Sequence, residues 1–328
     1  MQRTSRERSS TLAAAVSAGD RRALARAITL VESTRKADQE AAEALLTALL
    51  PRTGGAIRIG ISGAPGVGKS TFIETFGKTL SGQGWRVAVF AIDPSSRRSG
   101  GSILGDKTRM EKLARDPKAF IRPSPAGATL GGVARRTRES VLLAEAAGFG
   151  IVLVETVGIG QSETSVADMT DIFLLLVAPG GGDDLQGIKR GVMELADLVV
   201  VTKADGDLEA AARRTEADYR AAMHLMRPRH EGVQAAVMRV SSLTGLNIEE
   251  VWRTLGNIHA KLSATGALAR LRRDQARNWF RGEVQNVISE TIVSDRTLAK
   301  RASALEESVV EGRALPYAAA RELVSAIR

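Results

Sequence analysis

Residues 63–70 have the sequence Gly-Ala-Pro-Gly-Val-Gly-Lys-Ser, a complete match to the phosphate-loop pattern G-x-x-x-x-G-K-[ST]. Glycines let backbone N–H groups turn inward and contact phosphate oxygens, and the start of a following helix adds partial positive charge. We expect Lys69 to contact the β- and γ-phosphates and Ser70 to bind Mg²⁺. The predicted phosphate-binding residues are Gly63, Ala64, Pro65, Gly66, Val67, Gly68, Lys69, Ser70 and Thr71.

A second motif, Thr202-Lys203-Ala204-Asp205, indicates which base is bound. The Asp205 carboxylate can accept hydrogen bonds from the N1–H and the exocyclic amine of guanine, whereas adenine would leave it unpaired. The motif usually begins with Asn, and Thr202 in its place weakens the expected rigidity of the loop more than its choice of guanine. The sequence therefore predicts GTP and GDP as ligands. The predicted base-binding residues are Lys203, Asp205, Ser241, Ser242 and Leu243.

A third motif, Glu155-Thr156-Val157-Gly158, closes an apolar run. Most GTPases have Asp-x-x-Gly here, with the carboxylate on a metal-bound water and the Gly N–H on the γ-phosphate, so Gly158 joins the predicted nucleotide contacts. Ile159 stands where many GTPases place a water-orienting Gln, so another group must orient the water. Asp93 and Asp106 are candidates for this role and for magnesium binding, although Asp93 can also simply cap a turn before Pro94. The predicted metal ligands are Ser70, Asp93, Asp106 and Glu155.

Six short apolar runs are predicted to form the sheet that positions these motifs, and they alternate with helical stretches. The runs cover residues 57–62, 86–93, 150–156, 171–178, 198–203 and 237–242. Strands that are apolar on both sides and separated by helices are typical of a parallel sheet covered on both faces. We therefore expect a doubly wound, mostly parallel α/β domain of the P-loop GTPase type.

Helical patterns flank this domain on both sides. We expect an N-terminal helical extension at residues 1–51, a GTPase domain at 52–262 and a helical arm at 263–328. The arm begins with a long helix that carries an apolar seam, and two further helical stretches follow. It is a candidate dimerisation arm, with a helical flap packed on its own core as the alternative.

Composition excludes several classes of site. The 328 residues contain no cysteine, which excludes disulfides, Cys-ligated metals and thiol catalysis. They contain three scattered histidines, too few to indicate a metal cluster. The longest apolar run is far shorter than the roughly 20 residues of a membrane span, and the basic N-terminus lacks the apolar stretch of a secretory signal. We therefore expect a cytoplasmic protein without membrane contact. The net charge of +9 favours anionic ligands, but two tyrosines and no aromatic–basic clusters do not indicate nucleic-acid binding.

Four segments of the chain are AIDPSSRRSGGSILGDKTRM, RPSPAGATLGGVARRTRES, VETVGIGQSE and APGGGDDLQGIKRGVMELAD. They resemble the methylmalonyl-CoA mutase-associated G proteins, the MeaB/ArgK family that includes the human methylmalonic aciduria type A protein. The resemblance covers about residues 10–328. It implies a homodimeric GTPase of the signal-recognition/MinD/BioD class that acts as a chaperone for an adenosylcobalamin-dependent methylmalonyl-CoA mutase. The implied task is to gate cofactor loading and to protect and reactivate that enzyme.

The resemblance also assigns roles to individual residues. It implies that Asp93, Asp106 and Glu155 surround the Mg²⁺ ion and the attacking water. The loop at residues 180–190 resembles a third switch, in which Gln186 and Lys189 become organised when the partner binds. The predicted catalytic residues are Lys69, Asp93, Asp106, Glu155, Gln186 and Lys189.

Other functions of a P-loop protein remain as alternatives. A metallochaperone GTPase would need Cys or His ligands, and an RNA-binding targeting GTPase would need a Met-rich domain, whereas the seven methionines here are scattered. A nucleotide-dependent kinase is not distinguished from a GTPase by sequence. Phosphate-release assays with and without an acceptor separate these two activities.

Overall fold

The structure is a computed structural model that describes residues 2–92, 110–123, 130–156, 162–180 and 190–327. The chain divides into two compact units, Met1–Leu268 and Ala269–Arg328. The predicted domain limits at residues 51 and 262 remain predictions.

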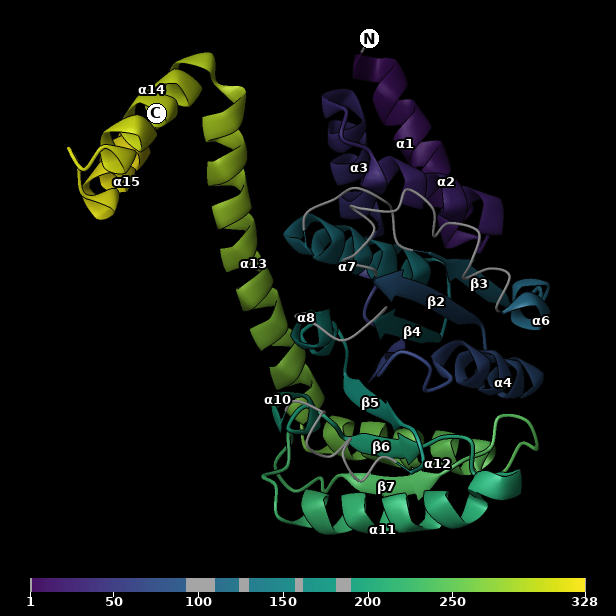
Figure 1. The fold of residues 1–328 in the computed structure, drawn as a ribbon. Helices are drawn as coiled ribbons and strands as arrows, with labels where there is room; N and C mark the ends of the chain where they lie inside the picture. Colours follow the sequence, from purple (N-terminus) through teal and green to yellow (C-terminus); the bar gives the residue numbers. More distant parts are fainter. Residues whose placement is uncertain (1, 93–109, 124–129, 157–161, 181–189, 328) are drawn as a thin grey trace. The chain divides into compact units, whose positions relative to one another are not determined.

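A seven-stranded sheet forms the centre of the first unit (Figure 1). Its strands are β1 (Ile57–Gly63), β2 (Val87–Ile92), β3 (Ala119–Arg122), β4 (Ile151–Thr156), β5 (Ile172–Val177), β6 (Leu198–Val201) and β7 (Ala236–Arg239). The order is β3-β2-β4-β1-β5-β6-β7, and every neighbouring pair is parallel. Parallel strands bring their carboxyl ends to one edge of the sheet, so the loops after β1, β4 and β6 emerge on the same side.

All six predicted strands are present, and the structure adds β3, which the sequence did not predict. β3 contains four residues, follows Lys118 and ends with Arg122, so it lacks the long apolar run by which the other strands were recognised. The other strands are mostly buried on both faces, as in β2 and β5, where every residue is buried. This two-sided burial confirms the predicted doubly wound fold.

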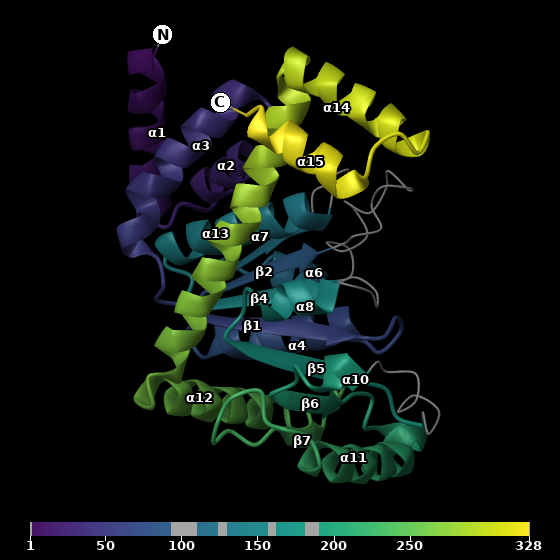
Figure 2. The ribbon, with the colours of Figure 1, turned by 90° about the vertical axis from the view of Figure 1, so that its left-hand side faces the viewer.

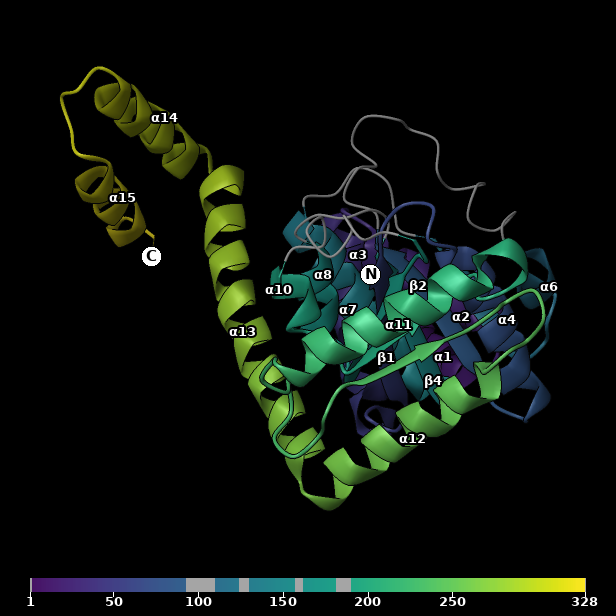
Figure 3. The ribbon, with the colours of Figure 1, turned by 60° about the horizontal axis from the view of Figure 1, so that its bottom comes forward.

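Helices cover both faces of the sheet (Figure 2). One face is covered by α4 (Lys69–Gly82) and α12 (Ile248–Ala264), and the other by α7 (Leu130–Ala146) and α8 (Ser162–Ala167). At the β7 end of the sheet, α11 (Glu209–His224) packs on β6 and β7, and Figure 3 shows α11 and α12 from below. The short helices α6 (Glu111–Ala114) and α10 (Arg190–Met193) lie between strands in sequence.

The main hydrophobic core lies between the sheet and the α4/α12 layer. Phe72 and Phe76 of α4 stack with ring centroids 5.4 Å apart, and both side chains are fully buried. Buried aromatic pairs contribute about 0.5–1.5 kcal/mol beyond the area that they bury. This packing holds the helix that begins at the phosphate motif rigidly against β1.

On the opposite face, a buried ion pair joins β1 to α7. The Arg58 guanidinium donates to both carboxylate oxygens of Glu145, at 2.8 and 2.9 Å, and the Glu145 carboxylate also accepts from the N–H of Gly54 at 2.8 Å. Arg58 is 5% exposed and Glu145 is 6% exposed. Each charge is therefore stabilised by the other, because water cannot reach the pair to replace a lost partner.

The three N-terminal helices form part of the first unit and pack on α7 and on one another (Figures 1 and 2). They are α1 (Gln2–Ser17), α2 (Arg21–Glu32) and α3 (Lys36–Leu49), followed by the short η1 (Leu50–Arg52). The Asp20 side chain caps α2 by accepting from the N–H groups of Arg22 and Ala23. The predicted N-terminal helical extension is confirmed.

The second unit is helical, as predicted. It contains most of α13 (Ala267–Ser294) and all of α14 (Arg296–Val310) and α15 (Pro316–Ser325), and α14 packs against α15. Several large apolar side chains of this unit are exposed, namely Phe280, Val284, Val287, Val293, Val310, Leu315, Tyr317 and Val324. Within the described part of the chain, no helix combines the length and the apolar character needed to cross a membrane.

Candidate functional site: the loops at the carboxyl edge of the sheet

The phosphate loop, residues 63–70, connects β1 to α4 and has the backbone shape that its glycines predict. Gly66 has φ +79° and Gly68 has φ +96°, in the left-handed region that strains other residues. A Cβ atom on Gly63 would lie 2.5 Å from the carbonyl oxygen of Leu176 in the neighbouring strand β5. The loop therefore requires glycine at these three positions, twice for conformation and once for space.

The carbonyl groups of this loop are hydrogen-bonded to side chains. Lys69 Nζ donates to the carbonyl oxygens of Gly63, at 2.7 Å, and Ala64, at 3.1 Å. Lys203 Nζ donates to Gly66 O at 2.8 Å, and Thr202 Oγ1 donates to Val67 O at 2.7 Å. The loop is thus held by its own lysine and by two residues that follow β6.

Two buried carboxylates act on the Lys69 ammonium. Burial lowers the pKa of Lys69 below its usual value, and the charges of Glu155 and Glu163 partly oppose that shift. Glu155 is the second-last residue of β4 and is 3% exposed, whereas Glu163 lies in the first turn of α8 and is 2% exposed. The structure therefore brings Glu155 into the electrostatic neighbourhood of the phosphate-loop lysine. It adds Glu163, which our sequence analysis did not select.

The base-recognition segment, residues 202–205, follows β6 and contacts the loop after β7. Lys203 adopts φ +53°, an uncommon conformation for a residue with a side chain. The Ser241 hydroxyl donates to the Asp205 carboxylate, and Ser241 Oγ accepts from the N–H of Thr244 at 3.1 Å. The residues predicted to recognise guanine therefore lie together, with Ser241 orienting Asp205.

The loop after β7 is also tied to the phosphate-loop helix. The Thr75 hydroxyl of α4 donates to the carbonyl oxygen of Ser242 at 3.0 Å. The next residue, Leu243, is 81% exposed. Thr75 thus joins the predicted base site to the helix that carries Lys69 and Ser70.

Five predicted residues lie outside the described part of the chain: Asp93, Asp106, Gly158, Gln186 and Lys189. Their assigned roles remain predictions. Within the described residues, no group of three or more His, Asp or Glu side chains is arranged to hold a metal. Ser70 and Glu155 offer a hydroxyl and a carboxylate oxygen, and oxygen donors of this kind suit Mg²⁺.

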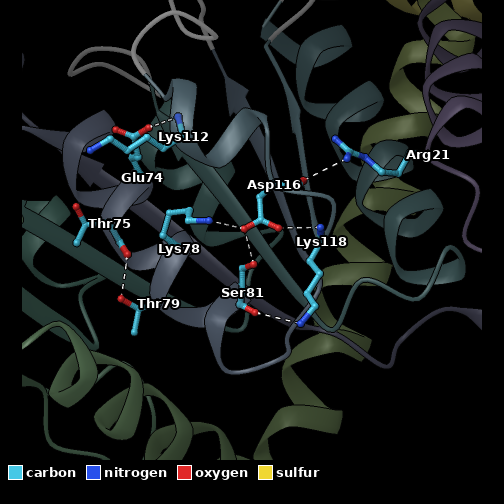
Figure 4. Close-up of polar contacts among 9 residues, drawn as sticks. All are labelled: Arg21, Glu74, Thr75, Lys78, Thr79, Ser81, Lys112, Asp116 and Lys118. Carbon is cyan, nitrogen blue, oxygen red and sulfur yellow. Dashed lines mark hydrogen bonds and ion pairs between the residues drawn. The ribbon is translucent and has the colours of Figure 1, made fainter.

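A second polar cluster holds α4 at the end far from the phosphates (Figure 4). The Asp116 carboxylate accepts from Lys78 Nζ at 2.7 Å, from Ser81 Oγ at 2.6 Å and from the N–H of Lys118 at 2.9 Å. Arg21 of α2 donates to the Asp116 carbonyl oxygen at 3.2 Å. Asp116 is 7% exposed, and it links α4, β3 and the N-terminal helices.

The electrostatics of Asp116 follow from these contacts. Burial by itself raises the pKa of the Asp116 carboxyl, but the hydrogen bonds from Lys78, Ser81 and the Lys118 N–H outweigh burial and lower it to about 2. Asp116 is therefore ionised in the folded protein at neutral and mildly acidic pH. In sequence it precedes Pro117, a context that indicates only a turn.

The chain is similar to several known proteins. The family model described as "Methylmalonyl Co-A mutase-associated GTPase MeaB" matches residues 24–297. A "Putative GTPase" of Caulobacter vibrioides is 54% identical over 309 residues, covering 94% of each chain. The mouse protein "Methylmalonic aciduria type A homolog, mitochondrial" is 48% identical over 320 residues, covering 94% of this chain and 77% of the mouse protein.

Two further relatives support the same assignment. The Escherichia coli "GTPase ArgK" is 47% identical over 270 residues, covering 82% of each chain. A crystal structure described as that of a "LAO/AO transport system kinase" superposes with a TM-score of 0.76 at 35% identity and covers 97% of this chain and 96% of its own. Identity at this level across nearly the whole chain, together with the family match and the complete phosphate loop, shows that the chain is a GTPase of the MeaB family.

Proposed function

We propose that this GTPase is a chaperone of an adenosylcobalamin-dependent methylmalonyl-CoA mutase, which gates cofactor loading and protects and reactivates the enzyme. The observation that carries the proposal is the family match over residues 24–297, because the description of that family names association with this mutase. The mouse and Caenorhabditis elegans relatives, both described as methylmalonic aciduria type A homologs, support it. The proposed location of the protein is the cytoplasm.

For the chemistry, we propose that Lys69 exchanges its two carbonyl partners for the β- and γ-phosphates when GTP binds. Its hydrogen bonds to the carbonyl oxygens of Gly63 and Ala64 keep the ammonium at the phosphate loop, which supports this proposal. Inward N–H groups of the loop and Lys69 would then stabilise the charge that develops on the transferred phosphoryl group. Asp205, held by Ser241, would accept the two guanine N–H donors.

The proposed metal is Mg²⁺, with Ser70, Asp93, Asp106 and Glu155 as its ligands or as ligands of its bound waters. When bound, the ion would neutralise charge on the β- and γ-phosphate oxygens. Glu155 would serve here as the buried carboxylate at the end of β4. Measuring phosphate release against Mg²⁺ concentration in the wild-type protein and in Glu155→Gln tests this role. A variant with wild-type Mg²⁺ dependence and rate would exclude it.

We also propose a homodimer that forms through residues 263–328. The support is the number of large apolar side chains that are exposed in the second unit, since exposed apolar surface often marks an interface. If the folded protein is a monomer by light scattering at micromolar concentration, the proposal is contradicted.

The decisive experiment for the partner is the rate of GTP hydrolysis with and without the mutase. We expect the mutase to raise kcat, because Ile159 stands where other GTPases have a water-orienting Gln. In other GTPases a missing catalytic group is often supplied by the partner, or by a loop that becomes ordered when the partner binds. The Lys69→Ala variant with mutase is the control that assigns the released phosphate to this chain. An unchanged rate, together with no co-elution of the two proteins, would refute the proposal.

The same assay tests the predicted third switch. We propose that mutase binding brings Gln186 or Lys189 to the nucleotide. The double variant Gln186→Ala, Lys189→Ala should then lose most of the stimulation. Stimulation equal to that of the wild type would exclude this segment as the coupling element.

A further inference from the structure

The chain leaves β1 and β4 towards opposite faces of the sheet. The phosphate loop leads from β1 to α4 on one face, whereas the chain after β4 continues to α8 on the other face. β1 and β4 are neighbours, so they form the topological switch point of the sheet (Figure 2). Ligands of doubly wound sheets bind in the crevice at the carboxyl ends of such strands. Contacts at the base of this crevice therefore set the distance between the phosphate loop and the end of β4.

The backbone ladder between these two strands stops at the base of the crevice. Its last register pair is Ile61 with Glu155. One residue further on, Ser62 is paired with β5 and Thr156 with β2. Each strand thus continues alongside its other neighbour. Among the described residues, no backbone pair joins β1 to β4 beyond this point.

The side chains of Ser62 and Thr156 make the next contact between the two strands. Their hydroxyl oxygens lie 2.9 Å apart, and either hydroxyl can donate. Ser62 is 1% exposed and Thr156 is fully buried. In the described part of the chain, each hydroxyl has the other as its only hydrogen-bond partner. This hydroxyl pair therefore joins the residue before the phosphate loop to the last residue of β4.

The hydroxyl pair and Glu155 lie on opposite faces of the sheet. Successive side chains of a strand point to opposite faces. Ile61 and Leu153 belong to the core between the sheet and the α4/α12 layer. Glu155 is in register with Ile61 and therefore lies on the same face, where Lys69 begins α4. The hydroxyl pair thus holds the end of β4 from the face opposite to the Glu155 carboxylate.

We propose that Ser62 and Thr156 are positioning residues, whose hydrogen bond fixes the distance between the phosphate loop and the Glu155 carboxylate. Binding of GDP needs the phosphate loop, which follows β1, whereas hydrolysis of GTP also needs the carboxylate that β4 contributes. Without the hydrogen bond the two strand ends can separate, and small displacements of catalytic groups reduce rates strongly. The inference rests on the proposed role of Glu155 at the metal, and it adds two residues that the predicted site does not contain.

Three single variants separate the hydrogen bond from the packing of the side chains. Thr156→Val keeps the shape and removes the hydroxyl, Thr156→Ser keeps the hydroxyl, and Ser62→Ala removes the partner. We expect kcat for GTP hydrolysis without mutase to fall about tenfold in Thr156→Val and in Ser62→Ala, equivalent to about 1.4 kcal/mol. Thr156→Ser should stay within about twofold of wild type. The affinity for GDP, measured in EDTA so that no metal contributes, should stay within about twofold of wild type in all three variants.

The double variant Ser62→Ala, Thr156→Val distinguishes positioning from a loss of stability. Each of the two single variants leaves one buried hydroxyl without its partner, which reduces stability, whereas removing both hydroxyls can be nearly neutral. The urea midpoint of the double variant should therefore return towards the wild-type value. Its kcat should remain about tenfold low, because the two positions share one interaction.

The matched control is Thr137→Val, which removes another buried hydroxyl, bonded to Val133 O at 2.9 Å within α7. We expect this control to hydrolyse GTP with the wild-type kcat.

Four results would overturn the proposal. They are a wild-type kcat in Thr156→Val, a Thr156→Ser variant as slow as Thr156→Val, a double variant that regains the wild-type kcat together with its stability, and a GDP affinity that falls as much as kcat. The variant Glu155→Gln tests the role of Glu155 separately. If Glu155→Gln hydrolyses GTP at the wild-type rate, Glu155 has no role in hydrolysis, while a loss of kcat in Thr156→Val would still show that the hydroxyl pair positions the end of β4.

Discussion

The Asp116 cluster allows a quantitative prediction about how the phosphate-loop helix is held. The substitution Asp116→Asn keeps the size of the side chain and removes its charge, which Lys78, Ser81 and the Lys118 N–H now contact. The folded-state pKa of about 2 lies nearly two pH units below the reference value of 3.8. At about 1.4 kcal/mol per unit, the ionised carboxylate contributes about 2 kcal/mol to folding at neutral pH.

The pH dependence has a definite sign. Because folding lowers the pKa, the contribution is fully present well above pH 4 and is lost as pH falls from about 4 towards 2. The difference in the free energy of unfolding between wild type and Asp116→Asn should be about 2 kcal/mol at pH 7. This difference should shrink by roughly half at pH 3, where the Asp116 carboxyl of the unfolded wild-type chain is already mostly protonated.

Urea unfolding followed by tryptophan fluorescence measures this difference, since Trp85 and Trp252 belong to the same compact unit as Asp116. The matched control is Asp218→Asn on the exposed side of α11, which should change stability by less than about 0.5 kcal/mol. A difference for Asp116→Asn that is equally small, or one that grows as pH falls, would refute the stabilisation assigned to the Asp116 carboxylate.

Three further predictions concern the base, the buried ion pair and the second unit. Asp205→Asn should shift preference from GTP towards XTP in competition binding, and a retained strong preference for GTP would exclude Asp205 as the residue that recognises the base. Arg58→Met should destabilise the fold by about 3–5 kcal/mol in urea, because it leaves Glu145 buried without its partner, and a loss below about 1 kcal/mol would contradict that dependence. A chain ending at Leu268 should be monomeric by light scattering and still bind GDP, whereas a dimer would place the interface elsewhere.

Much of the fold could be predicted because strands buried on both faces have an unmistakable pattern. β2, β4 and β5 are six-residue strands with every residue buried, and their sequences are almost entirely apolar. β3 was missed because its four residues, Ala-Phe-Ile-Arg, follow Lys118 and end in a charged residue, so they form no long apolar run. The predicted strand at 198–203 ended too late, since Thr202 bonds to Val67 and Lys203 adopts a positive φ, which ends the strand at Val201.

The site was predictable where a local motif fixes the chemistry, and not where the fold alone creates it. The phosphate loop is contiguous in sequence, so its residues could be named together. Asp116 lies 35 residues from its partner Ser81, and Glu163 acts on Lys69 across 94 positions of chain, so no local pattern indicates either. In sequence, Thr202 is a departure from the usual Asn of the motif. Its hydroxyl contact with Val67 O joins residues far apart in the chain, so only the structure shows it.

The hydrogen bonds of Lys69 to the carbonyls of its own loop have a consequence for the thermodynamics of nucleotide binding. In the free protein, burial lowers the pKa of this ammonium, whereas phosphate charge in a complex would raise it. A ligand that raises the pKa of a group binds together with a proton between the two values, by linkage. Nucleotide binding in alkaline solution should therefore take up protons, with a heat that varies with the ionisation enthalpy of the buffer. Affinity should decline once pH exceeds the free-state pKa of Lys69.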